Sequence, residues 1–249
     1  MNSRPLLWRG LGAALALAAT TTPAATPRGF APDQSGFFLG GGAIVPVFVH
    51  ENRYDPLPAW IGPDAGLSGS TQPFRIPGKA GFFWNLTRIE FQAYGRIVLN
   101  AASTWTSVSP GGSGEAAYRS YGAGFQTSYF PLATAGVRVG FAASAELVLE
   151  KLNLRFRPDT GGTQIADLSA TAKLVGVGPL VQIWLGDLWA LEISSLYQFG
   201  LPGTWSLGQA TDFLGGTRSA GALRNFLDGG AVPADFGGLL LEATLRLTF

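Results

Sequence analysis

Apolar and polar residues alternate along the last stretch of the chain, from Leu239 to Phe249. One parity is entirely apolar, and the other is polar except for Leu240. Because a β-strand turns successive side chains to opposite faces, this pattern predicts one strand with an apolar face and a polar face. Its length is close to the ~9–11 residues with which a β-strand crosses a bilayer. An edge strand of a soluble sandwich is the alternative for this segment alone.

The phase of this strand avoids an energetic penalty. A slip by one residue would turn Glu242 and Arg246 toward lipid. An arginine near the bilayer midplane costs roughly 2–4 kcal/mol, and a glutamate costs less. The pattern therefore favours a strand with its apolar side toward lipid and both charges on the inner side.

Similar segments recur along the chain and predict an all-β fold. The connections between them alternate between longer and shorter, which is typical of outer-membrane proteins with short periplasmic turns and longer outer loops. An eight-stranded antiparallel up-and-down transmembrane β-barrel with both termini periplasmic satisfies this alternation. The eight predicted strands cover approximately residues 36–49, 80–93, 97–106, 116–130, 135–152, 165–185, 188–200 and 236–249.

The sequence permits two interpretations at each of two places along these strands. Residues 94–96 are read as a short hairpin turn around Gly95, although the apolar phase of Ile89 to Leu99 also fits one uninterrupted strand. The hairpin is preferred because it preserves an even number of strands. In the sixth strand the apolar residues change parity above Lys173, which indicates either a β-bulge or a simple continuation with Lys173 at the outer rim.

The start of the chain predicts export. Arg4 and Arg9 precede a short apolar run, 11–19, and small residues follow at Thr22 and Ala24, so residues 1–24 are interpreted as a signal peptide. A retained membrane anchor is the alternative, but the run is shorter than the ~20 residues of a spanning helix. Residues 25–35 are then an N-terminal periplasmic segment, and residues 36–249 form the barrel.

Composition supports a membrane location. The chain is 47% hydrophobic and only 13% charged, against about 25% charged residues in typical soluble domains. It contains no cysteine, which excludes disulfides, thiolate metal sites and a lipoprotein anchor. The net charge of +1 gives no reason to expect a nucleic-acid partner.

Charged residues fall on the predicted inner face of the strands. Eight strands enclose a space only wide enough for side chains or one small ligand, so a nearly balanced charge set favours a paired polar plug over an open pore. Aromatic residues are expected at two levels. The residues expected near the periplasmic ends are Phe37, Phe38, Tyr129, Phe130, Trp184, Trp189 and Phe249, and those expected near the outer ends are Phe82, Phe83, Trp84, Trp105, Tyr197 and Phe199. The predicted interior network comprises Arg88, Glu90, Arg96, Arg138, Glu146, Glu150, Glu192, Glu242 and Arg246.

The pattern resembles small bacterial outer-membrane barrels of the OmpA-like, OmpX-like and OmpW-like group. The resemblance rests on the signal peptide, the Gly-rich aromatic first strand at 36–45, the loop alternation and the terminal Phe249. It is architectural and covers residues 36–249. It implies that the last strand, with Leu245, Leu247 and Phe249, is read by the barrel-assembly machinery of a Gram-negative cell envelope.

The loops are the remaining place for a functional surface. Residues 219–228 are predicted to form about two turns of amphipathic helix. The first and fourth loops either fold over the barrel mouth or form an apolar ligand cleft. The candidate ligand or partner residues in these loops are Tyr54, Trp60, Phe74, Trp205, Phe213 and Phe226.

Catalysis receives little support from the sequence. His50 is the only histidine, and with Glu51, Asp55 and a serine (Ser68, Ser70 or Ser107) it would form part of a lipid-modifying site. No motif joins these residues, and neither a cofactor nor a metal site is expected. The sequence therefore predicts a non-enzymatic, porin-like outer-membrane barrel with a structural, adhesive or anchoring role, and with membrane lipids and envelope proteins as partners. A conduit for small apolar molecules and a lipid-modifying enzyme are the alternatives.

Overall fold

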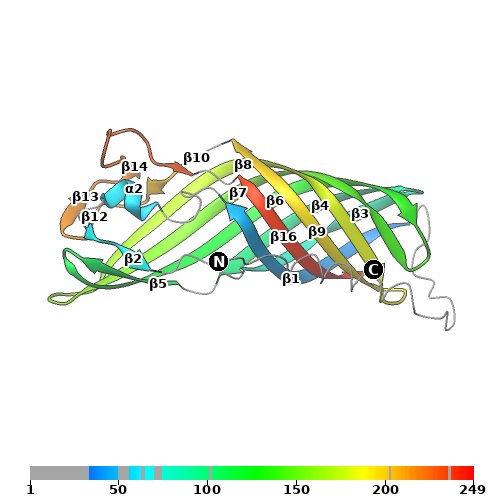
Figure 1. Cartoon of the computed structure of the whole chain (residues 1–249), viewed down its shortest axis with the longest axis horizontal. Coiled ribbons are helices and arrows are strands. Elements are labelled where there is room, and N and C mark those ends of the chain that lie inside the picture. The colour runs from blue at the N-terminus through cyan, green and yellow to red at the C-terminus, as the bar shows by residue number, and fades with distance from the viewer. Residues whose placement is uncertain are drawn as a thin grey trace, which may run out of the picture.

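The fold is built around a closed ring of eight antiparallel strands (Figure 1). The computed structural model describes residues 34–49, 56–62, 65–69, 75–100, 103–201, 203–234 and 237–249. The last strand of the ring pairs with the first, so no strand of the ring has an unpaired edge along this seam. The all-β antiparallel prediction is thus confirmed. The ring strands are β1 (Ser35–Val49), β3 (Arg75–Leu86), β4 (Ile89–Asn100), β6 (Gly111–Ala133), β7 (Val137–Pro158), β8 (Gln164–Trp184), β9 (Trp189–Leu201) and β16 (Gly238–Thr248).

Three consecutive strands extend well beyond the others. β6, β7 and β8 have 23, 22 and 21 residues, whereas β3, β4, β9 and β16 have 11 to 13. In Figure 1 their long ends reach the side where the small elements gather. These small elements are α2 (Leu57–Ile61), β2 (Ser68–Gly69), β5 (Ser103–Val108), β10 (Gly203–Thr204), β11 (Ser206–Leu207), β12 (Thr211–Phe213), β13 (Gly216–Arg218), β14 (Gly221–Ala222) and β15 (Pro233–Ala234).

The small elements form a cap on the extended sheet. We use "cap" for α2 together with residues 203–234. β5 pairs with β6 on one side of the extension, and β11 pairs with β8 on the other. Buried apolar residues of the cap and of the extended strands form the largest apolar core among the described residues.

The polarity of the two faces of β7 reverses along its length: the outer face changes from apolar to polar, and the inner face from polar to apolar. From Val137 to Leu149 the outward residues are apolar, and the inward residues include Arg138 and Glu146. From Lys151 onward the outward residues are polar, while inward Leu152, Leu154 and Phe156 are buried. The pairing with β8 shows no register shift through this region, so the strand changes environment without changing phase. The ring is therefore polar inside at one end and apolar inside at the other.

β8 shows the same reversal, which decides between the two alternatives at Lys173. Its register with β7 is continuous, and Lys173 is exposed on the outer face. Leu168, Ala170 and Ala172 change parity relative to the lower strand because the inside becomes apolar there. The structure contains a simple continuation and no β-bulge at this point.

The predicted turn at 94–96 was wrong. The chain reverses at Thr87–Arg88, and β4 runs uninterrupted through Gly95, which pairs with Ala80 and Ala123. Thr87 adopts a positive φ of 52° in this two-residue turn. Residues 75–79, expected in the first loop, therefore belong to β3, and the ring keeps eight strands without a break at Gly95.

The predicted helix at 219–228 was also wrong. Gly221 has a φ of 113°, which is incompatible with a helix, and Arg224 instead forms a β-bridge with Ala231. The amide of Leu223 donates to the carbonyl oxygen of Trp205 at 2.8 Å, which joins two segments of the cap. A short helix, α2, forms in the first connection instead. No helix in the described ranges is long and apolar enough to cross a membrane.

Substitution at the seam between β1 and β16 tests ring closure. A Cβ added to Gly42 would overlap the carbonyl oxygen of Ala243 on the facing strand, whereas at Gly41 the nearest atom is Pro77 O at 3.8 Å. We expect Gly42→Val to lower the free energy of unfolding by about 1–3 kcal/mol because the backbones must separate. Urea unfolding followed by circular dichroism measures this. Gly41→Ala serves as the control, and equal stability of the two variants would contradict the assigned seam.

Candidate functional site

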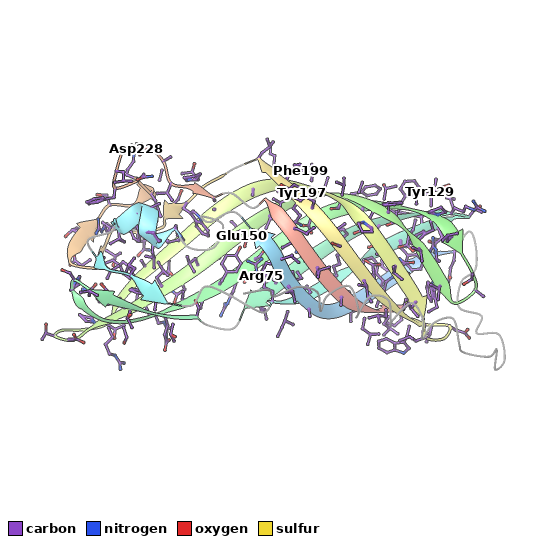
Figure 2. All side chains as sticks on the ribbon, viewed as in Figure 1. Arg75, Tyr129, Glu150, Tyr197, Phe199 and Asp228 are labelled. Carbon is purple, nitrogen blue, oxygen red and sulfur yellow. The ribbon has the colours of Figure 1, made fainter. Side chains whose placement is uncertain are left out.

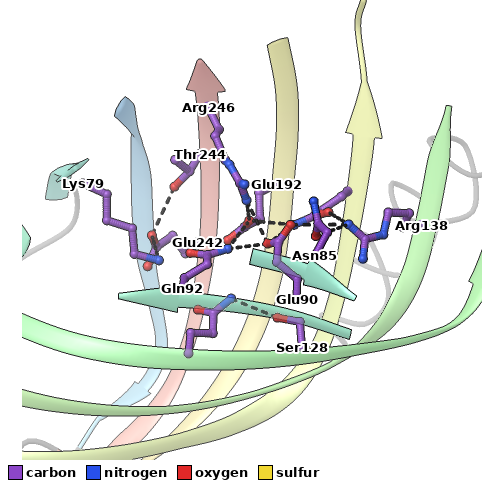
Figure 3. Close-up of polar contacts among 12 residues, drawn as sticks. Lys79, Asn85, Glu90, Gln92, Ser128, Arg138, Glu192, Glu242, Thr244 and Arg246 are labelled. Atoms are coloured by element: carbon purple, nitrogen blue, oxygen red, sulfur yellow. Dashed lines mark hydrogen bonds and ion pairs between the residues drawn. The ribbon is translucent and has the colours of Figure 1, made fainter. Parts of the chain in front are cut away.

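A buried carboxylate, Glu90 on β4, lies at the centre of the polar interior (Figure 3). Its Oε1 is 2.8 Å from Nη1 of Arg246 on β16, and its Oε2 is 3.4 Å from Nη1 of Arg138 on β7. One carboxylate thus joins strands on different sides of the ring. Because these side chains are almost fully buried, each charge depends on its partner for stabilisation.

Side-chain amides connect Glu90 to a second carboxylate. Gln182 donates from Nε2 to Glu90 at 3.0 Å and to Glu192 at 3.1 Å, while its Oε1 accepts from Arg138 at 3.2 Å. Gln92 donates to Glu90 at 2.7 Å and approaches Glu192 at 3.4 Å. These amides distribute hydrogen bonds among like-charged groups and make the assembly a connected network.

A second group of charges lies farther along the ring. Arg96 on β4 is 3.3 Å from Glu146 on β7 and 3.6 Å from Glu242 on β16. Lys79 on β3 approaches Glu242 at 3.8 Å, and Thr244 donates to the same carboxylate at 3.1 Å. Ion pairs therefore cross the interior at two successive levels.

The interior charges balance in number. Each predicted member of the network except one lies inside the ring. Arg88 differs, because it lies in the exposed turn beside Thr87. Arg75 and Lys79 are interior residues that the sequence analysis did not include, because residues 75–79 were assigned to a loop. Among the residues that the structure describes, five cations, Arg75, Lys79, Arg96, Arg138 and Arg246, share the interior with five anions, Glu90, Glu146, Glu150, Glu192 and Glu242.

Aromatic rings pack on the network toward the short-turn end. The Arg138 guanidinium carbon is 3.6 Å from the ring centre of Phe130, and that of Arg246 is 4.5 Å from the ring centre of Phe83. Phe83 and Phe130 are fully buried. The buried rings fill part of the interior at this end, and their faces stabilise the cations.

At the opposite end the interior is closed by the cap. Trp60 of α2 stacks on Phe213 of β12 with ring centres 5.7 Å apart, and Trp105 of β5 stacks on Phe156 of β7 at 5.3 Å. Trp205, inside the cap, is fully buried. The described parts of the first and fourth connections thus fold over the mouth of the ring, which is one of the two arrangements expected from the sequence.

The residues predicted as a loop surface separate into two groups. Trp60, Trp205 and Phe213 are buried in the cap core, so they present no surface in this structure, while Phe226 is 54% exposed. Tyr54 and Phe74 lie outside the described residues. Trp105, expected on the outer face, is inward and 8% exposed because it belongs to β5 rather than to a continuation of β4.

The predicted aromatic levels on the outer face are found only in part. Phe38, Phe83, Phe130 and Trp184 are buried rather than outward. Phe82 and Trp84, expected near the outer ends, lie close to the Thr87–Arg88 turn at the opposite end, because the first hairpin reverses there. In Figure 2, Tyr129 lies toward the short-turn end, and Tyr197 and Phe199 lie nearer the cap. All three are at least 38% exposed. Leu245, Leu247 and Phe249 are also on the outer face of β16, and the Phe249 amide donates to the carbonyl oxygen of Phe37.

Most of the candidate catalytic residues lie outside the described part of the chain. His50, Glu51, Asp55 and Ser70 lie outside it, and Ser68 is in β2. The hydroxyl of Ser107 donates to the carbonyl oxygen of Ala65 at 3.0 Å and is buried. Across the described ranges, no three His, Asp or Glu side chains are grouped to hold a metal ion.

Comparison with known proteins does not assign the chain to a family. A scan against protein-family models finds no match, and a search of curated proteins finds no similar sequence.

Removing the charge of Glu90 tests the interior network. Glu90→Gln preserves the shape of the side chain but leaves Arg138 and Arg246 without the carboxylate they share. We expect a loss of about 3–5 kcal/mol in the free energy of unfolding, measured in urea, because two buried cations lose their shared carboxylate and Arg246 keeps only the 3.7 Å contact with Glu192. Arg88→Gln, in the exposed turn, should change it by less than about 0.5 kcal/mol. Equal effects of the two variants would show that the ion pairs contribute little.

Proposed function

We propose that this chain is a non-enzymatic outer-membrane β-barrel with a closed interior, which anchors its cap at the cell surface in a structural or adhesive role. The observation that carries this proposal is the reversal of both strand faces along β7 and β8. An apolar outer face is stable only where the surroundings are apolar, and a polar outer face with an apolar core is typical of a part in water.

The height of the apolar outer surface fits a bilayer. On β7 it runs from Val137 to Leu149. At ~3.3 Å per residue this stretch is about 40 Å long, and at the roughly 40° tilt of membrane strands it covers about 30 Å along the membrane normal. The hydrocarbon core of a bilayer is also ~30 Å thick.

The unequal ends support an orientation. Short connections, such as Thr87–Arg88 and residues 134–136, lie at one end, while the cap lies at the other. In outer-membrane barrels the short turns are periplasmic and the long connections are outside. The cap is therefore proposed to be extracellular and the C-terminal end of β16 periplasmic, with residues 1–24 as the export signal.

The closed interior favours anchoring over transport. The Glu90 level, the Arg96 level and the cap core follow one another along the ring and fill it with paired and packed side chains. A conduit would need coordinated displacement of several ion pairs together with the packed rings of the cap. The outer surface of the cap, where Leu227 is 82% exposed, is instead available for an envelope or extracellular partner.

The proposed outer-membrane location also suggests how the chain is inserted into the membrane. The outward residues Leu245, Leu247 and Phe249 belong to the strand that completes the ring against β1. We propose that the barrel-assembly machinery recognises this strand and that outer-membrane lipids then cover the apolar belt.

Single-cysteine labelling tests the membrane assignment without background, because the chain has no cysteine. In liposomes, Ala145→Cys on the apolar belt should resist a polar maleimide, while Asn153→Cys on the polar extension should react quickly. Both positions face outward on β7, so strand and orientation are matched. Labelling in denaturant must become equal. Fast reaction at both positions in the folded protein would refute the membrane-spanning proposal.

Single-channel recording in planar bilayers tests the closed interior. We expect no persistent conductance steps from the wild-type protein, because the paired charges and the cap block ion passage. The double variant Glu90→Ala/Arg246→Ala removes side chains from the network and should increase leak events. Stable steps from the wild-type protein would favour the conduit hypothesis over the anchor.

A further inference from the structure

A basic hollow lies on the outer face where β6, β7 and β8 leave the apolar belt. Its volume is about 690 Å³, and Tyr121 and Ser169 are among the lining residues. The charged residues that line it are Arg119, Lys151 and Arg155 together with Glu115 and Asp167, so cations exceed anions by one. Arg119 faces Lys151 across the β6–β7 pair, and Lys151 faces Ser169 across the β7–β8 pair. These side chains belong to neither the interior network nor the cap core.

Arg119 and Lys151 lie close enough that a bound anion would reduce their repulsion. Directly opposed residues in an antiparallel pair have Cβ atoms about 5 Å apart, and like charges at this distance destabilise the sheet. Within the described part of the chain, neither Arg119 nor Lys151 has an ion pair with a carboxylate, and both are exposed. The Lys151 ammonium lies 6.0 Å from the ring centre of Tyr121, so it is held near the hollow.

Positive charge also predominates among the other outward residues around the hollow. Along the polar extensions of these three strands, the exposed cations outnumber the exposed anions. The amide of Asn153 already donates to the carboxylate of Asp167. The exposed cations are Arg119, Lys151, Arg155 and Arg157, and the exposed anions are Glu115 and Asp167.

The position of the hollow specifies the kind of anion. One step along β6 and β7 toward the short-turn end, Tyr121 and Leu149 face outward on the apolar belt. A molecule bound by Arg119 and Lys151 would therefore place an anionic group in water and an attached apolar part beside Tyr121. A phosphate suits the site, since arginine binds its oxygens in a fork and lysine acts as a point charge.

We infer that this hollow binds a phosphorylated lipid of the membrane leaflet next to the cap. The inference rests on the proposed membrane location, because only there does the belt continue into acyl chains. The lipid phosphate would lie between Arg119 and Lys151 and offset their repulsion, while its chains pack on Tyr121 and Leu149. The site thus fixes the depth and rotation of the protein relative to its lipids.

Lipid binding can be measured by native mass spectrometry of the detergent-solubilised protein. The probes are diphosphorylated lipid A, its dephosphorylated form and inorganic phosphate. We expect binding of the diphosphorylated lipid only. The variant Arg119→Gln/Lys151→Gln should bind it roughly thirtyfold more weakly, from the typical contribution of two basic residues near a membrane surface.

The matched control is Arg88→Gln/Arg224→Gln, which removes the same charge at exposed positions away from the hollow. It should bind within twofold of wild type. Equal binding of both lipid forms, wild-type binding by the Arg119/Lys151 variant or an equal loss in the control would overturn the inference. Comparable binding of inorganic phosphate would indicate an anion site without lipid selectivity and would also overturn it. Cysteine labelling at Ala145 and Asn153 reports separately on the membrane location, so failure of the lipid site and failure of the barrel proposal give different results.

Discussion

Charge pairing inside the ring is the constraint on which the rest of the structure depends. Glu90, Arg138 and Arg246 come from three different strands and meet within hydrogen-bonding or ion-pair distance. A buried charge without its partner is strongly destabilising, so the register of each of these strands is tied to that of the others. The polar interior therefore selects one ring closure among the many that an apolar alternation alone would permit.

The second constraint is that each strand meets two environments in sequence. On β7 the change occurs between Leu149 and Lys151 outside, and between Glu150 and Leu152 inside. Because both faces change together, the extended sheet needs a cover for its apolar inner face, and α2 and residues 203–234 supply it. The cap thus covers the apolar inner face of the extended strands. The basic hollow lies on the opposite, outer face of the same strands.

Alternation along the chain predicted most inward and outward positions because it depends only on strand geometry. It gave the correct face for Glu90, Glu146 and Arg246 without knowledge of their partners. It misplaced the first hairpin turn because glycine is common in turns and Gly95 therefore looked like one. The actual turn contains Thr87, which adopts a positive φ although it is not a glycine. The contact between Glu90 and Arg246, 156 residues apart, depends on the closed register and cannot be read from local sequence. In β8 the apolar residues change parity along the sequence. The cause is tertiary, because Leu168 and Ala172 face inward and pack in the apolar core with the cap.

The composition of the cap has a kinetic consequence. Its core joins Trp60, from the connection after β1, to Phe213, from the connection before β16, and the Phe226 amide donates to the Ala59 carbonyl oxygen. These segments lie near one another only after the first and last strands have met. Contacts this distant in sequence form slowly, because the entropy of closing the long intervening chain is lost before the contact stabilises the fold. The cap then acts as a latch across the seam, so separation of β1 from β16 must first extract stacked tryptophan and phenylalanine rings. The persistence of the closed ring is consequently governed by the rate of cap opening as well as by its equilibrium stability.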